Sequence, residues 1–346
     1  MTDTRLPGGA PGANNRTYVR TNLGRRDQFL VGLLRAAFAV GQVAAPALAA
    51  RAAEQLFFRP PRRRPSRVGL PAGGRRVPAG APSGPLAVWS WGHGPAVYLL
   101  HGWGGRAEQL AGFVGPLVNA GFRVVALDAP GHGRSAGRLS SAPEFARALV
   151  SVAERCGAPH GFVAHSLGAA AVAIALRNGV PARRLVFIGA PLQPLAWVDA
   201  FARRLGLEAA VLDRMRKLSE RRLAFDWDDL VVAPPPAVPA PPLLVVHDRD
   251  DREVASDDGA AIAATWPGAR LYTTTGLGHH RVLRDPAVVA VAAAFLSGER
   301  METSPLGQAA CVHERTPPEA GDRCEDCTLE ADLFAPERRR LGACPA

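Results

Sequence analysis

The sequence predicts an α/β protein with a mostly parallel central sheet and helices on both faces of that sheet. Its strand candidates are short, continuous apolar runs, which are typical of strands buried on both sides. Helical patterns lie between these runs, so strand and helix alternate along the chain. One connection of about fifty residues interrupts the alternation, and we expect it to form a small helical lid.

The elements follow one another over a single large domain, residues 86–298. Residues 86–91 alternate like an exposed strand and come first. The apolar runs are residues 96–100, 124–127, 162–164, 185–188, 243–246 and 270–273. The helical patterns are residues 107–120, 143–155, 167–177 and 286–296. The lid covers about residues 191–242 and contains helical segments at 197–204 and 208–222.

Segments of different composition flank this domain. Residues 1–24 are rich in Gly, Asn, Arg and Thr, and we expect them to be disordered. Residues 25–58 are expected to form an amphipathic helix. Residues 59–85 are a Pro-, Gly- and Arg-rich linker with a short strand near residues 76–79, and residues 299–346 form a cysteine-rich tail.

The N-terminal helix allows two interpretations. Arg25-Arg26 precede an apolar run and a small-residue stretch follows it, which resembles a secretory leader. Arg35 interrupts the run, however, and the run is too short and too broken to span a bilayer comfortably. We therefore expect a cytoplasmic protein whose helix docks on the body or lies on a membrane surface, with export as the alternative.

The net charge of +10 would ordinarily suggest a nucleic-acid partner. Lys217 is the only lysine, and heavy use of arginine together with Ala, Gly and Pro indicates a coding bias. The one basic cluster, at residues 59–76, lies in the Pro/Gly-rich stretch and is interpreted as a solvated linker, with contact to an anionic surface as the alternative. We therefore expect no nucleic-acid partner.

The strongest local signal is the segment Ala164-His165-Ser166-Leu167-Gly168, between an apolar run and a small-residue helix. In a nucleophile elbow the serine lies on a cramped strand-to-helix turn, and its neighbours must be small. Ala164 replaces the usual first glycine, which is the least bulky departure. The alternative is an ordinary serine that caps a helix.

An acid and a histidine follow downstream, in the order that a Ser-acid-His triad of this type requires. A buried strand runs into an acidic turn, and Asp251 is the candidate acid because it lies a few residues past the strand end. Asp248 and Asp250 are expected to cap the turn instead. His279 follows a glycine on the loop after the last strand, whereas His280 is expected at the surface or behind the site.

A glycine-rich loop, His101-Gly102-Trp103-Gly104-Gly105, follows the strand that ends at residue 100. A loop in this position supplies one backbone N–H of an oxyanion hole, and the residue after the nucleophile supplies the other. The pattern assigns these roles to the backbone amides of Trp103 and Leu167.

With these motifs the chain resembles the α/β-hydrolase superfamily over residues 86–298. Residues 128–135 resemble the family's stretch after the next strand, in which His132 and Ser135 are expected to be structural. The resemblance supports Asp251 and His279 over their neighbours. It implies that a small ester-like molecule is hydrolysed without a cofactor, as by a carboxylesterase, thioesterase or lactonase.

Two alternatives stay open at this point. One is a non-catalytic protein of the same fold that binds a ligand or acts as a scaffold. The other is a haloperoxidase-like or acyltransferase member of the superfamily. A serine at the elbow argues against epoxide hydrolases and dehalogenases, which the resemblance would otherwise include.

The cysteine-rich tail offers one further candidate site. Cys311, His313, Cys324 and Cys327 give four ligands of a type that tetrahedral zinc accepts. A structural zinc ion could hold a segment that is too short to form its own core. A disulfide after export, or free thiols, are the alternatives.

Overall fold

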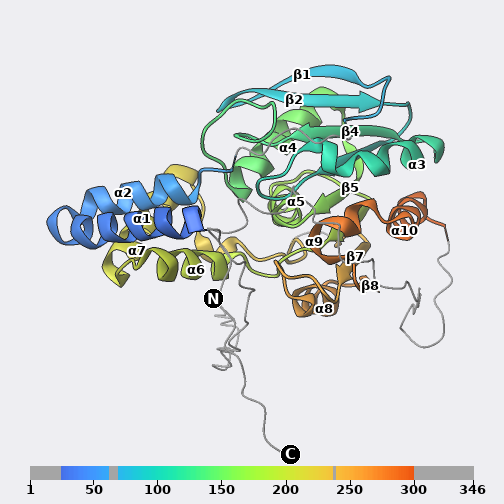
Figure 1. The fold of residues 1–346 in the computed structure, drawn as a ribbon. Helices are drawn as coiled ribbons and strands as arrows, with labels where there is room; N and C mark the ends of the chain where they lie inside the picture. The colour runs from blue at the N-terminus through green and yellow to red at the C-terminus, as the bar shows by residue number, and fades with distance from the viewer. Residues whose placement is uncertain (1–24, 62–68, 237–238, 300–346) are drawn as a thin grey trace, which may run out of the picture.

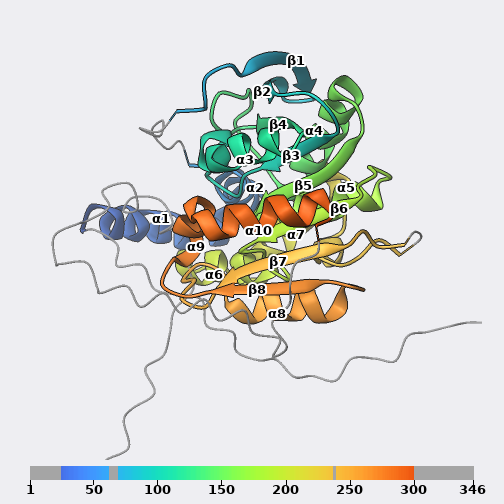
Figure 2. The ribbon, with the colours of Figure 1, turned by 90° about the vertical axis from the view of Figure 1, so that its right-hand side faces the viewer.

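The computed structural model describes residues 25–61, 69–236 and 239–299. Its centre is an eight-stranded sheet of order β1-β2-β4-β3-β5-β6-β7-β8 (Figures 1 and 2). The strands are β1 (Arg75–Ala81), β2 (Gly84–Trp91), β3 (Ala96–Leu100), β4 (Arg123–Asp128), β5 (Pro159–His165), β6 (Arg184–Ile188), β7 (Leu243–Asp248) and β8 (Arg270–Thr274). The pairs β1–β2 and β2–β4 are antiparallel, and every other pair is parallel. The predicted fold class is confirmed.

Helices cover both faces of the sheet, as the strand pattern predicts. The helices are η1 (Ala107–Phe113), α3 (Val114–Asn119), α4 (Ala142–Cys156), α5 (Leu167–Arg177), α8 (Ser256–Thr265), α9 (Gly278–Arg281), η3 (Val282–Arg284) and α10 (Pro286–Ser297). Residues Tyr98 and Leu100 of β3 face the layer of α4, α5 and α8, whereas Val97 and Leu99 face η1, α3 and α10. Because β3 is buried on both faces, it reads as a continuous apolar run.

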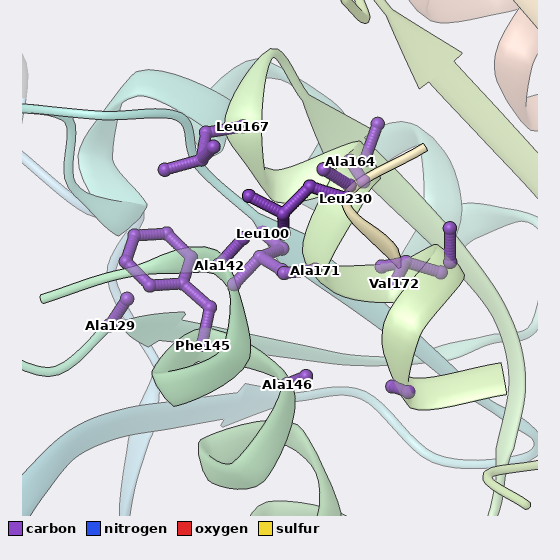
Figure 3. Close-up of a cluster of buried hydrophobic side chains, with 14 of the residues drawn as sticks. Leu100, Ala129, Ala142, Phe145, Ala146, Ala164, Leu167, Ala171, Val172 and Leu230 are labelled. Carbon is purple, nitrogen blue, oxygen red and sulfur yellow. The ribbon is translucent and has the colours of Figure 1, made fainter. Parts of the chain in front are cut away.

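The layer of α4, α5 and α8 packs under the end of β3 and the start of α5. Figure 3 shows Leu100 at the end of β3 among Phe145, Ala171 and Leu230, with Leu167 close by. All five side chains are buried. The small residues of α5 let this helix pack close to the sheet, which fixes where α5 begins.

The N-terminal segment differs from the single helix predicted over residues 25–58. It forms two helices, α1 (Arg25–Ala44) and α2 (Pro46–Phe57), which lie side by side (Figure 1). Pro46 is the physical reason, because proline has no N–H to continue α1 but fits the first turn of a new helix.

The lid contains α6 (Leu195–Leu205), α7 (Ala209–Leu223) and a short η2 (Trp227–Asp229). Helix α1 packs on α6, and α2 packs on α7. These four helices stand together on one side of the sheet (Figure 1), and we call them the cap. The N-terminal helices are therefore an extension of the lid, which the sequence did not predict.

The short strand predicted near residues 76–79 is present as β1, but the linker is shorter than predicted. Strand β1 and the start of β2 lie within residues 59–85, so the sheet begins earlier than residue 86. Residues 86–91 were expected to be an exposed strand, but all of them are buried. The reason is that β2 lies between β1 and β4 and is covered by side chains on both faces.

Several predictions fall outside the described residues. They are the disorder of residues 1–24, the zinc ligands Cys311, His313, Cys324 and Cys327, and most of the basic cluster. The structural zinc thus stays a prediction. Among the helices of the described ranges, none has the length and apolar content needed to cross a membrane.

Candidate active site

Ser166 lies in a sharp turn between β5 and α5. Its backbone has φ = 50° and ψ = −123°, and it is one of two non-glycine residues with positive φ among the residues that the structure describes. This conformation is strained for a residue with a Cβ atom, and such strain is concentrated at functional sites. The Ser166 N–H donates to the carbonyl oxygen of Ile188 (2.9 Å), which ties the turn to β6. This is the strand-turn-helix context that a nucleophile elbow requires.

Two glycines let the loop after β3 approach this turn. A Cβ atom on Gly102 would lie 2.8 Å from the Cβ atom of Ser166. A Cβ atom on Gly168 would lie 2.7 Å from the carbonyl oxygen of His101. The backbone of the Trp103 loop therefore lies against the elbow, beside the start of α5 where Leu167 is located.

Gly102→Ala is expected to lower kcat/KM by roughly 10²-fold, since the added methyl group must displace Ser166 or the loop. Ester hydrolysis and the melting temperature should be measured together, because the fold itself is expected to survive. Gly115→Ala is the matched control, since nothing lies within 4 Å of a Cβ atom there. Equal activity of the Gly102 and Gly115 variants would show that the loop is not held against the serine.

Asp251 and His279 form a buried pair at the carboxyl edge of the sheet. The Asp251 Oδ2 atom lies 2.7 Å from His279 Nδ1, and both side chains are almost completely buried. The other oxygen, Oδ1, accepts from the N–H groups of Glu253 (2.8 Å) and Val254 (2.9 Å). With Nδ1–H donating to Asp251, the Nε2 atom of His279 is left as the proton acceptor.

The charge state of Asp251 follows from these contacts. Burial is the largest single effect and would raise the pKa of this carboxyl group, whereas the charge of His279 lowers it. Hydrogen bonds from His247, His279 and the Val254 N–H lower it further, so the pKa lies far below its ordinary value. Asp251 is therefore ionised at any working pH.

Asp248 caps the turn after β7, as expected, by accepting from the Asp250 N–H (2.9 Å), and both neighbouring acids also bind the histidine loop. Asp248 accepts hydrogen bonds from the N–H groups of Leu277 (3.1 Å) and Gly278 (2.9 Å). Asp250 accepts from the Gly276 N–H (2.8 Å). These two carboxylates hold the loop that carries the histidine, whereas Asp251 contacts the His279 ring.

His165 positions the histidine loop from the elbow side. Its Nε2 atom lies 3.0 Å from the carbonyl oxygen of His279, and the two rings are 4.5 Å apart between centroids. Burial lowers the pKa of His165 well below its usual value, so the ring is neutral and donates this hydrogen bond. Since His165 precedes Ser166 in the chain, this hydrogen bond ties the His279 loop to the elbow.

Two other buried histidines hold the Trp103 loop. His132 Nε2 accepts from the Gly104 N–H (3.0 Å), and its Nδ1–H donates to the Pro130 carbonyl oxygen (2.9 Å). His101 Nε2 accepts from the Ala129 N–H (3.0 Å). Burial lowers the pKa of both rings, which keeps each of them in the neutral form that can donate and accept.

Sequence reasoning missed the roles of His101 and His165, although both were quoted within motifs. It treated His132 and Ser135 as structural, and the Ser135 hydroxyl indeed bridges the Asp128 carbonyl oxygen and the Ala87 N–H. Asp128 accepts from the Ala107 N–H (2.7 Å), a contact that no local pattern indicates. The available signal was a histidine or acid at the carboxyl end of a buried strand.

Glu253 is a site residue that the sequence did not suggest. Its carboxylate lies 2.8 Å from His280 Nε2 and 3.8 Å from His279 Nε2. Burial raises the pKa of Glu253, but the charge of His279 and the hydrogen bond from His280 lower it to about 2. The side chain is still 36% exposed, so solvent screens its interactions.

Glu253→Gln is expected to move the acid limb of the kcat/KM profile to lower pH by roughly half a unit to one unit. Glu253 is ionised over this range, and its negative charge near His279 Nε2 favours the protonated imidazole, which cannot act as a base. Removing the charge makes His279 lose its proton at lower pH. Glu154→Gln, on the exposed side of α4, should leave the profile unchanged. A shift to higher pH would contradict this account.

The sequence of this chain matches the model of one protein family. The model of the alpha/beta hydrolase family matches residues 97–293, more than half of the chain. The chain belongs to the alpha/beta hydrolase family. The match starts in β3 and ends in α10, so it contains the elbow, the acid and the histidine loop. It leaves out α1, α2, β1 and β2.

Curated relatives of this hydrolase include two enzymes. A 2-hydroxy-6-oxononadienedioate/2-hydroxy-6-oxononatrienedioate hydrolase of Klebsiella pneumoniae is 27% identical over an alignment of 230 positions, which covers 53% of this chain and 80% of that protein. A pimeloyl-[acyl-carrier protein] methyl ester esterase of Methylococcus capsulatus is 46% identical over 50 residues. That second match spans only 14% of this chain and 19% of the esterase.

Solved structures agree on the architecture. An esterase from Exiguobacterium antarcticum has a TM-score of 0.50 and 16% identity, with 64% of this chain and 99% of that chain covered. A serine hydrolase from Cycloclasticus zankles has a TM-score of 0.50 and 15% identity, with 65% and 99% covered. At these identities the likeness establishes the fold alone.

Proposed function

We propose that this alpha/beta hydrolase is a serine hydrolase that cleaves a carboxylic ester-like bond through an acyl-enzyme. The observation that carries the proposal is the buried Asp251–His279 pair, 2.7 Å apart, beside a serine held in a strained turn. A protein that only binds a ligand needs none of these groups together. The nearby glycine loop adds the backbone donors that ester hydrolysis requires.

In the proposed first half-reaction, His279 Nε2 takes the proton of the Ser166 hydroxyl as its oxygen attacks the substrate carbonyl. The N–H groups of Trp103 and Leu167 stabilise the resulting oxyanion, and each such donor typically contributes roughly 2.7–4 kcal/mol. Collapse of the tetrahedral intermediate breaks the ester bond, and His279 gives its proton to the departing alcohol. The acyl group then remains on Ser166.

In the second half-reaction a water molecule replaces the alcohol. His279 takes a proton from the water, whose oxygen attacks the acyl carbon, and the same N–H groups hold the oxyanion. The bond to Ser166 breaks, and His279 returns the proton to the serine. Asp251 stays ionised throughout and keeps the Nδ1–H tautomer of the imidazole. No cofactor takes part in this scheme.

The lid side chains that could have formed an acyl pocket mostly pack within the cap. Phe201 and Trp227 are buried, and the Phe57 ring of α2 lies 5.2 Å and 6.0 Å from their respective ring centroids. Core packing therefore accounts for these aromatic residues. The bond type and the chain length of the acyl group are left to the experiment.

The test is a hydrolysis screen with p-nitrophenyl esters of increasing acyl length, together with matched thioesters and lactones. We expect turnover of at least one class with release of the free acid. Transfer of the acyl group to a second alcohol in preference to water would indicate an acyltransferase. A folded protein that hydrolyses none of them and is not modified by a fluorophosphonate would favour the ligand-binding alternative and contradict the proposal.

A further inference from the structure

The exposed side of α1 is apolar from Phe29 to Val43. At about 100° per residue, the large side chains fall on one half of the helix surface, and three alanines fill the space between them. Phe29 is 67% exposed, Leu33 is 53% exposed and Val43 is 79% exposed. Leu48, at the start of α2, extends this surface and is 64% exposed. We call this surface the apolar face; it consists of Phe29, Leu30, Leu33, Val40, Val43 and Leu48.

Arg35 and Gln42 lie on the other side of α1, against the lid. The Arg35 guanidinium donates to the carbonyl oxygens of Arg203 (3.1 Å) and Arg204 (2.8 Å). The Gln42 side chain donates to the Gly206 carbonyl oxygen (3.1 Å) and accepts from the Glu208 N–H (3.0 Å). Between residues 28 and 50, Arg35 is the only charged residue.

Helix α1 packs Phe38 and Leu34 against the core, yet it also exposes large apolar side chains, whereas an ordinary surface helix exposes a polar side. Soluble monomers rarely leave an apolar patch of this extent in water. Lid packing explains why Arg35 and Gln42 face inward, but it does not explain the six exposed apolar side chains. These side chains indicate an apolar surrounding on the outer side of the cap.

A basic groove lies beside the apolar face. It is a hollow of about 510 Å³ between α2 and α7, and it starts at Ala47, next to Leu48. Four basic side chains and one acidic side chain line it: Arg51, Arg214, Lys217, Arg221 and Asp213. Asp213 pairs with Lys217 at 2.7 Å, and the three basic residues of α7 share one side of that helix through their spacing of three and four.

We propose that the cap docks on an anionic phospholipid surface. The apolar face enters the boundary between head groups and acyl chains, as amphipathic helices do when they lie in the plane of a membrane. The basic groove takes the head-group phosphates, for which arginine provides a matching planar set of donors. The attraction to an anionic leaflet adds to the apolar contact.

A second copy of this chain would fit the apolar face less well. A symmetric dimer brings the same surface patch of both subunits together. Because the basic groove adjoins the apolar face, a dimer would also place two clusters of like charge close to each other. The charge therefore favours an anionic surface over a self-complementary one.

The experiment is co-sedimentation of the full-length protein with vesicles of phosphatidylcholine, with and without phosphatidylglycerol. We expect strong binding to the mixed vesicles that weakens with salt, and much weaker binding to phosphatidylcholine alone. Leu33→Glu/Val40→Glu should abolish binding to both. Arg214→Glu/Arg221→Glu should weaken binding to the mixed vesicles by at least roughly tenfold, since each basic residue near an anionic surface contributes on the order of fivefold.

Leu271→Glu and Arg270→Glu are matched controls, because they change an exposed leucine and an exposed arginine on β8, away from the cap. Both should bind vesicles like the unaltered protein, and the circular dichroism of all variants should match. The proposal is overturned if the unaltered protein does not sediment with either kind of vesicle. It is also overturned if the protein is a dimer that Leu33→Glu/Val40→Glu converts to a monomer without changing vesicle binding.

Discussion

Replacing Ser166 with alanine is expected to lower kcat/KM for a short p-nitrophenyl ester by roughly 10⁴-fold or more, down to a residual rate from the oxyanion donors and substrate binding. The hydroxyl oxygen is the atom that forms the acyl-enzyme in our mechanism, and alanine has no such atom. Stability should change little, because alanine adopts the same strained backbone with a similar volume. Initial rates across a substrate range would measure the effect.

Ser141→Ala is the matched control for this prediction. Ser141 caps the N-terminus of α4, where its Oγ atom accepts from the Glu144 N–H (3.3 Å). Its loss should cost about 1 kcal/mol of stability and leave kcat/KM unchanged. If Ser141→Ala and Ser166→Ala kept equal activity, the serine assigned as the nucleophile would be wrong.

Asp251→Asn is expected to lower kcat by roughly 10³–10⁴-fold, while Asp248→Asn should reduce it far less. An amide at position 251 no longer fixes the Nδ1–H tautomer of His279. The other tautomer carries its proton on Nε2, so Nε2 cannot accept the proton of the serine hydroxyl. Asp248→Asn weakens the hydrogen bonds to the Leu277 and Gly278 N–H groups, which should lower stability by about 1–3 kcal/mol. Rates and melting temperatures of both variants separate the two roles.

The pH dependence gives a second readout for Asp251. Because its folded-state pKa lies far below the ordinary value, the ionised group stabilises the fold above about pH 4. This contribution is lost only as the pH falls from there toward the folded-state pKa. The melting-temperature difference between the unaltered protein and Asp251→Asn should therefore be large at neutral pH and shrink on acidification. A difference that grows in acid would contradict the assignment.

The sheet could be predicted from the sequence because its strands are buried on both faces. A continuous apolar run such as residues 243–246 is by itself typical of a buried parallel strand. Because parallel strands are joined by crossover helices, their carboxyl ends lie at the same edge of the sheet. The same logic failed for residues 86–91, whose alternation suggested exposure. Only the pairing with β1 and β4 shows that this strand lies inside the sheet.

The details of the site could be predicted less well. Asp248 ends β7 and Asp251 lies three residues further on, so the choice between them depends on how the turn directs each carboxylate. The burial of His101 and His165 depends on contacts between distant segments, which no local pattern carries. Pro46 was visible as a helix breaker, but the packing of α1 on α6 is a tertiary contact that composition does not encode.

The most direct test of the central claim is covalent labelling with a fluorophosphonate, followed by peptide mapping. We predict a single adduct on Ser166, absent from Ser166→Ala and formed far more slowly in His279→Ala, with ester hydrolysis lost in step with labelling. An adduct on another residue, or an active esterase that the probe leaves unmodified at Ser166, would contradict the mechanism.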